Sequence, residues 1–315
     1  MRRLTVEEVH RSCEELRDWG RWGEDDEAGT LNHATPEKLV EAARLVATGE
    51  VYALAIDFGA SGPQTGDLGR FNPVHAMLAT GTDAERGLQD EMNLRYSDDI
   101  LSLPVHAATH WDSLSHIFYG DRMWNGREAG LVSARGAARN GIEKVKDRMV
   151  GRGVLLDLAR YRGVEALEDG YAVTNADLDG CAGEQGVEIR GGDFLLLRTG
   201  QLGRCLRAGA WGKFAGGDAP GLAFETLWWL REREVAAVAS DTWGVEVRPN
   251  EVEGAFQPWH WVAIPNMGLS VGEIFYLEEL AASCAADSRY GFLFVAPPLP
   301  IAGGSGSPVN PVAIK

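Results

Sequence analysis

Four short apolar segments in the second half of the chain most constrain its fold. They are residues 154–158 (VLLDL), 194–198, 235–239 and 292–296. A run that is short and apolar at successive positions is typical of a strand buried on both faces. Three helical patterns lie between them, over residues 175–186, 222–233 and 275–285. Strands that alternate with helices predict the α/β class.

The first half of the chain is less regular. Helices are predicted over residues 4–17 and from Thr35-Pro36 to about Thr48, where a capping hydroxyl and a proline mark the start. The remaining expected elements are strands over 51–56 and 74–79, long polar loops over 58–73 and 80–99, an apolar run over 100–105 and a short charged helix over 141–149. Neither a linker nor an internal repeat appears. A single domain over 1–315 is therefore expected, with 1–50 as a helical N-terminal extension.

Composition excludes several classes of function. The 315 residues carry a formal charge of −16 and no long Lys/Arg run, which disfavours nucleic acid and anionic membranes as partners. No apolar run reaches about 18 residues, and the N-terminus lacks the apolar core of a signal peptide. The four cysteines show no CxxC spacing. A cytoplasmic protein with buried, reduced thiols is expected. GxGxxG, Walker and GxSxG motifs are absent, so nucleotide binding and serine-hydrolase chemistry have no support.

The chemistry of the chain is concentrated around three of its seven histidines, His106, His110 and His116, which surround Asp112. Four residues separate His106 from His110, as on one helical face, and two separate His110 from Asp112, as on one side of a strand. A turn through Thr109 satisfies both spacings. Imidazole and carboxylate are ligands of zinc and manganese, and three such groups leave open coordination positions, as in catalytic sites.

The alternative for this cluster is a hydrogen-bonded polar loop packed under aromatic residues. For the isolated histidines His10, His33 and His75, a structural role is the default expectation. His116 need not be a ligand, because a free imidazole beside a metal site is a suitable general acid and base.

The stretch from His106 to His116 resembles the HxGTHxDxPxH signature of the cyclase-like family, which includes bacterial kynurenine formamidase and isatin hydrolase. Ala108 replaces the motif glycine and Leu114 the proline, which is typical of a divergent, longer branch. Other blocks of the chain also resemble that branch: NPVHAMLATGTDA (72–84), RGVLLDLAR (152–160), GDFLLLRTG (192–200), SDTWGVEV (240–247), MGLSVGEIFYLEELA (267–281) and GSPVNPVAI (306–314).

The resemblance implies a swivelling β/β/α fold of the cyclase and kynurenine formamidase type, a homo-oligomer (dimer or tetramer), and a divalent metal, Mn²⁺ or Zn²⁺. It also implies a second pair of ligands, for which His260 and Glu273 are the matching residues. Their alternative roles are packing beside Trp259 and Trp261 for His260, and a helix N-terminal carboxylate for Glu273.

The expected function is metal-dependent hydrolysis of a small-molecule amide C–N bond, in an aryl formamide, an imide or a lactam. His106, His110 and Asp112 would hold the metal, and His116 would act as acid and base. Trp22, Phe71 and Trp124 are the residues expected to stack on a flat substrate. A metal-assisted cyclase or dehydratase is the alternative, and a non-catalytic binding protein is the third hypothesis.

Overall fold

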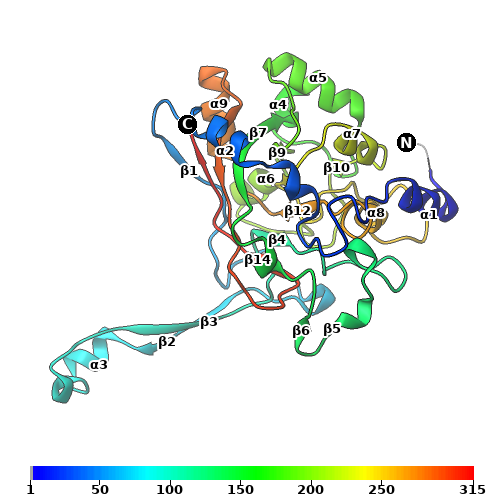
Figure 1. The fold of residues 1–315 in the computed structure, drawn as a ribbon. Coiled ribbons are helices and arrows are strands. Elements are labelled where there is room, and N and C mark those ends of the chain that lie inside the picture. Colours follow the sequence, from blue (N-terminus) through cyan, green and yellow to red (C-terminus); the bar gives the residue numbers. More distant parts are fainter. Residues whose placement is uncertain (1–2) are drawn as a thin grey trace.

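The computed structural model of the protein describes residues 3–315, and its centre is a nine-stranded mixed sheet. The strands are β1 (Val51–Ala53), β4 (His110–Asp112), β7 (Val150–Asp157), β9 (Phe194–Arg198), β11 (Ala237–Ser240), β12 (Ser270–Glu273), β13 (Gly291–Val295), β14 (Gly306–Pro308) and β15 (Val312–Ile314). Their order is β1-β15-β13-β7-β9-β11-β12-β4-β14 (Figure 1). The pairs β7–β9, β9–β11 and β11–β12 are parallel, and the outer pairs are antiparallel.

Helices cover both faces of this sheet. They are α1 (Val6–Glu15), α2 (Pro36–Ala43), α4 (Leu158–Tyr161), α5 (Asn175–Gln185), α6 (Gln201–Ala208), α7 (Thr226–Glu232), α8 (Pro258–Ala263) and α9 (Glu278–Asp287). Val154 and Leu156 of β7 pack in one core with side chains of α1, α5, α7 and α8. Leu155, which points the other way, packs in a second core with α9. The apolar runs are therefore strands buried on both faces, as predicted.

Long-range hydrogen bonds set several element ends that local patterns did not predict. Helix α2 stops at Ala43, and the backbone N–H of Thr48 donates to the carbonyl of Lys315 (3.0 Å). Gly221–Leu222 forms strand β10, paired with β8 (Ala172–Val173), so α7 begins only at Thr226. Helix α9 begins at Glu278, because the N–H of Phe275 donates to Ser240. The expected helix over 141–149 is a short 3₁₀ turn at Ile142–Val145.

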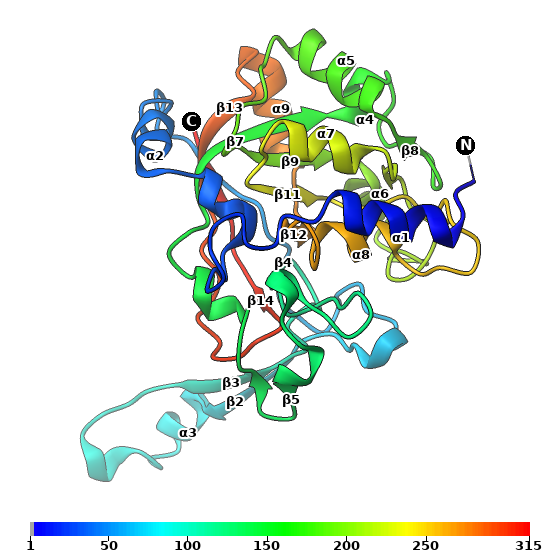
Figure 2. The same ribbon diagram turned by 45° about the vertical axis from the view of Figure 1, so that its right-hand side comes forward.

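A separate hairpin, called the arm, projects away from the body of the protein in both views (Figures 1 and 2). Its strands β2 (Val74–Ala79) and β3 (Asp98–Ser102) pair only with each other among the described residues, and helix α3 (Gly81–Glu85) lies between them. The loop expected over 80–99 thus contains a helix and the start of a strand. Large apolar side chains of the arm are exposed: Val74, Met77, Leu78, Leu88, Leu94, Ile100 and Leu101.

Another two-stranded sheet joins β5 (Val132–Ser133) to β6 (Gly136–Ala137). No helix among residues 3–315 combines the length and the apolar character that a bilayer crossing requires. All four cysteines are free thiols, and Cys13, Cys181 and Cys284 are buried.

Candidate metal centre

Strand β4 carries two of the predicted ligands on one face. His110 and Asp112 are two residues apart, and Trp111 between them points into the opposite core. The strand lies between β12 and β14, and the register places Glu273 directly opposite His110 and Gly306 opposite Asp112. The sheet itself therefore brings Glu273 beside a histidine that is distant in sequence.

A turn before β4 brings His106 to the same place. The N–H of Ala107 donates to the carbonyl of Pro104 (2.9 Å), which reverses the chain directly before the strand. The hydroxyl of Thr109 then donates to the carbonyl of Ile274 (2.6 Å) and accepts from the N–H of Ile56 (3.0 Å). This is the turn through Thr109 that satisfies both sequence spacings.

Helix α8 supplies His260. Proline at the first helical position fixes the start of this helix, and the N–H and Nδ1 of His260 both donate to Oε1 of Glu246 (3.1 and 2.6 Å). The ring is thereby held with Nε2 towards Oε1 of Glu273, at 3.3 Å.

Five side chains converge in this buried region. Nε2 of His110 is 3.3 Å from Oε2 of Glu273 and 3.5 Å from Oδ1 of Asp112, and Nε2 of His106 is 3.3 Å from that same Oδ1. Two overlapping groups have ligand atoms within 4.8 Å of one another: His106 with His110 and Asp112, and Asp112 with His260 and Glu273. Asp112 belongs to both, so it is placed to bridge them.

Several of these buried polar atoms have no hydrogen-bond partner among the described residues. They are Nε2 of His106, His110 and His260, and Oδ1 of Asp112. Because an unpaired buried polar group is costly, four such atoms at one point call for an absent partner. Nδ1 of His110 donates to the carbonyl of Ala108 (2.7 Å), as Nδ1 of His260 does to Glu246. These bonds leave the Nε2 lone pairs directed inward, as in metal sites.

Charge favours a divalent cation as that partner. Although burial raises the pKa of Glu273, the adjacent imidazoles of His110 and His260 hold it below its usual range. Burial likewise raises the pKa of Asp112, but the imidazoles of His116, His110 and His106 lower it in the same way. Two ionised carboxylates, Asp112 and Glu273, thus face imidazoles in a buried space. Three imidazoles and two carboxylates fit Zn²⁺ or Mn²⁺ in donor type and in charge.

His116 lies beside this centre with a different exposure. Its ring stacks on that of His106, with centroids 4.1 Å apart and an interplanar angle of 25°, and its Nε2 is 3.9 Å from Oδ1 of Asp112. The side chain is 21% exposed, whereas the side chains of the other cluster members are 8% exposed or less. Burial lowers the pKa of His116, so the imidazole is neutral at pH 7 and can accept a proton.

The three residues expected to stack on substrate lie in different environments. Phe71 is 48% exposed. Trp22 is half-buried and packs against Trp124 and His33, with ring centroids 6.0 and 5.2 Å apart. Trp124 is fully buried and its indole N–H donates to Asp26 (3.2 Å), so this conformation leaves it no exposed face for stacking.

The isolated histidines all have protein partners. Nδ1 of His10 lies 2.7 Å from the hydroxyl of Tyr119, and Nε2 of His75 lies 2.8 Å from Oδ2 of Asp99 in the arm. His33 packs edge-on against Trp22. None of the three belongs to either metal-ligand group.

Sequence reasoning missed Glu246, which orients His260. The only signal was its place in the block SDTWGVEV, fourteen residues before the histidine. It also missed the role of the Ala108 carbonyl, which any residue type could supply and no sequence pattern marks.

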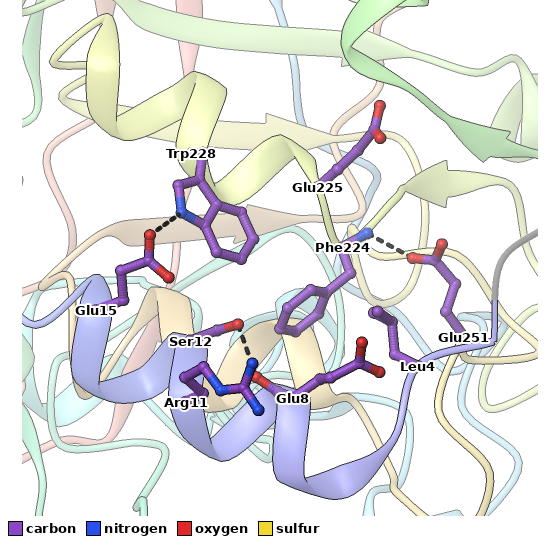
Figure 3. Close-up of a pocket in the computed structure, with 9 residues that line it drawn as sticks. All are labelled: Leu4, Glu8, Arg11, Ser12, Glu15, Phe224, Glu225, Trp228 and Glu251. Carbon is purple, nitrogen blue, oxygen red and sulfur yellow. Dashed lines mark hydrogen bonds between the residues drawn. The ribbon is translucent and has the colours of Figure 1, made fainter.

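A cavity of about 270 Å³ between α1 and α7 is distinct from this centre (Figure 3). Its lining combines glutamates with aromatic rings, and the indole N–H of Trp228 donates to Glu15 (3.2 Å). None of the five clustered residues lines it. This cavity is therefore not the place where the candidate metal ligands gather.

The fold and the buried cluster together define an α/β protein with a candidate metal site. The family model described as "Putative cyclase" matches residues 71–247, which include His106, His110, Asp112 and His116. The match covers more than half of the chain, and the chain belongs to this family.

Solved structures agree with this assignment. A crystal structure of "a novel cyclase" is 38% identical, with a TM-score of 0.88, and the alignment covers 95% of this chain and 99% of that one. Isatin hydrolase A from Ralstonia solanacearum is 20% identical with a TM-score of 0.62, covering 88% and 95%. A predicted metal-dependent hydrolase from Bacillus stearothermophilus is 17% identical with a TM-score of 0.53, covering 85% and 98%. No curated protein matches the chain. The expected α/β class and cyclase-type fold are confirmed.

Proposed function

We propose that the protein is a metal-dependent hydrolase of a small-molecule amide C–N bond, such as that of an aryl formamide, an imide or a lactam. The observation that carries this proposal is the convergence of four unpaired buried ligand atoms beside a more exposed, neutral imidazole. His106, His110, Asp112, His260 and Glu273 would hold the metal, Mn²⁺ or Zn²⁺. When bound, a divalent cation supplies Lewis acidity, which lowers the pKa of water and polarises a carbonyl.

His116 has the geometry and protonation state for both proton transfers. As the neutral base, its Nε2 would take a proton from the attacking water, and as the acid it would give that proton to the leaving nitrogen. The reaction adds hydroxyl to the carbonyl carbon and hydrogen to nitrogen, and the C–N bond breaks. Stacking on His106 and the nearby carboxylate of Asp112 would keep the ring oriented through both steps.

Of the three expected stacking residues, Phe71 is the most exposed and would be the most available to a flat substrate, while the half-buried Trp22 would offer only part of its ring. We also propose a homo-oligomer, a dimer or tetramer. What supports it is the exposed apolar arm, since an isolated two-stranded hairpin is at best marginally stable in water.

The test begins with metal analysis of protein purified without added metal. The same protein, loaded with Mn²⁺ or Zn²⁺, is then screened against formamides, imides and lactams, and the molecular masses of the products are measured by mass spectrometry. Hydrolysis adds the mass of water, whereas the alternative, a metal-assisted cyclisation or dehydration, leaves the mass unchanged or lowers it. If the protein binds stoichiometric metal but forms a dehydrated product and no hydrolysis product, the alternative is correct and this proposal is wrong.

A further inference from the structure

Two arginines near the metal centre have no acidic partner. The guanidinium carbons of Arg70 and Arg248 lie 5.6 and 5.5 Å from the ring centroid of Trp243. Within residues 3–315, neither guanidinium donates a hydrogen bond to the protein or lies within ion-pair distance of a carboxylate. Nη1 of Arg248 and Nε1 of Trp243 are buried without an acceptor. Arg248 also lies over the ring of Phe256, 4.9 Å from its centroid. Two like charges and unpaired donors thus gather around the indole of Trp243, and these groups have the chemistry that binds an anion.

Two carboxylates, those of Glu246 and Asp218, act on Arg248 without forming an ion pair with it. Glu246 is only two residues from Arg248, but its Oε1 accepts from His260 and its Oε2 accepts from Asn250 and the N–H of Trp259. Both oxygens are therefore committed to orienting the candidate ligand His260. Burial lowers the pKa of Arg248 by more than the charges of Glu246 and Asp218 raise it, which reflects the cost of burying this cation.

Trp243, over which both arginines lie, connects them to the metal centre. Trp243 is 4% exposed and packs in one cluster with Ala108 and Ile274, which lie next to the predicted ligands in sequence. The N–H of Ile274 donates to the carbonyl of Thr242 (3.0 Å), which joins the residue after Glu273 to the residue before Trp243. Ala108 is one of the two departures from the family signature, and here it belongs to the same apolar cluster as the indole of Trp243.

Arg70 is adjacent in sequence to Phe71, the exposed ring expected to stack on substrate. Its guanidinium is half-buried and lies over the indole of Trp243. An anion held by Arg70 would therefore lie beside the indole that packs next to the metal centre.

We propose that Arg70, Arg248 and the indole N–H of Trp243 form an anion subsite that selects substrates carrying a carboxylate beside the scissile amide. Guanidinium groups bind planar carboxylates through paired N–H donors, and the unpaired donors here have that chemistry. This inference rests on the proposed hydrolase function and adds its substrate class, an anionic amide. Within a chain of net charge −16, the two guanidinium groups provide the local positive field that such a substrate needs.

Binding of two isosteric probes tests the subsite without turnover. Isothermal titration of the metal-loaded protein is carried out with benzoate and with neutral benzamide. We expect benzoate to bind roughly 10- to 100-fold more tightly, because charge-assisted hydrogen bonds form only with the carboxylate. Arg70→Gln and Arg248→Gln are each expected to remove about 10-fold of that preference at unchanged metal content. Arg95→Gln, an arginine of the arm paired with Asp90, is the matched control and should leave the preference intact.

Equal binding of the two probes, or a benzoate preference unchanged in both glutamine variants, overturns the subsite. The second result would mean that benzoate binds the metal directly. If a glutamine variant does not fold, the Arg→Lys variant at that position retains the charge without the paired donors and should lose part of the preference. Hydrolysis of neutral formanilide without any benzoate preference would reject the subsite alone. Arginine-dependent benzoate binding with no amide hydrolysed would reject the proposed function alone.

Discussion

The arm ends at Ser102 and the metal-ligand cluster begins at His106, so two regions that are neighbours along the chain can be compared directly. In the cluster, polar atoms are buried and lack hydrogen-bond partners. In the arm, apolar side chains such as Leu78 and Leu88 are 65% and 72% exposed. Each region is unfavourable as it stands, because one forgoes hydrogen bonds and the other forgoes burial. Under the proposals made above, a small charged partner would stabilise the first region and a large apolar one the second.

Of the variants considered, removal of a single metal ligand should have the largest effect on metal content and turnover. His110→Ala deletes the imidazole that contacts both carboxylates, and we expect loss of bound metal and a fall in turnover on the order of 10⁴-fold. His116→Ala should retain metal and lose 10²–10⁴-fold in turnover, since it removes only the proton transfer. Metal analysis and rates on both variants provide the measurement. Full activity in the second variant would exclude the acid–base role of His116.

Glu246→Gln tests the residue that orients the candidate ligand His260, while the ligand itself is unchanged. The amide keeps the shape but removes the charge that holds Nδ1 of His260, and loss of such an orienting partner typically costs about 10- to 100-fold in metal affinity. Competition with a metal chelator measures that affinity. Glu225→Gln, in the cavity of Figure 3, is the control and should bind metal as the wild type does. Unchanged affinity in Glu246→Gln would separate His260 from the metal site.

The arm is tested by the double variant Leu78→Ser/Leu88→Ser. If two copies of the chain cover these side chains, the substitution should weaken self-association by roughly 10-fold or more, because each leucine loses its apolar burial. Sedimentation velocity across a concentration series measures this. Leu299→Ser removes a similarly exposed leucine outside the arm and is expected to leave the assembly unchanged. Identical mass distributions for all three proteins would contradict the homo-oligomer formed through the arm.

The smallest effect concerns a buried carboxylate that does have partners. Asp241 is buried, and burial raises its pKa to about 6 although Thr199 and Gly200 donate hydrogen bonds to it. The folded pKa exceeds the unfolded value, so the stabilisation is present at low pH and is lost as pH rises through 6. Between pH 5 and pH 7 this loss is about 1 kcal/mol.

Asp241→Asn cannot ionise, so its deficit in free energy of unfolding relative to wild type should shrink by that amount over the same interval. Urea unfolding at the two pH values measures it, with the exposed Asp147→Asn as control. A deficit that grows with pH would mean that the wild-type carboxylate is stabilised in its ionised form.

The central sheet was predictable from sequence because its strands carry their own signal. Segments 154–158 and 194–198 are apolar at successive positions whatever lies around them, and they form the paired strands β7 and β9. The arm was only partly predictable. Asp98 and Asp99 look like loop residues, yet they begin β3, because the hairpin is exposed and imposes no apolar pattern on them.

The site divides in the same way. His106, His110, Asp112 and His116 were found because they lie within one short stretch with interpretable spacing. Glu246, Arg70 and Arg248 were not identified from sequence, because only the fold brings Glu246 to His260, and Arg70 and Arg248 to Trp243. A lone arginine or glutamate in a loop is common in any sequence. Its role becomes visible only when the structure shows which groups it contacts.

The position of β14 has a consequence for how the protein matures. Gly306 lies opposite Asp112, and a side-chain carbon there would come within 2.4 Å of Nε2 of His106, so only glycine leaves the histidine in place. β4 therefore acquires one of its two neighbours only when residues near 306 have left the ribosome. Contacts between such distant segments form slowly. Metal binding would then be among the last events of folding. In a population of newly made chains, bound metal would mark those in which β14 has paired with β4.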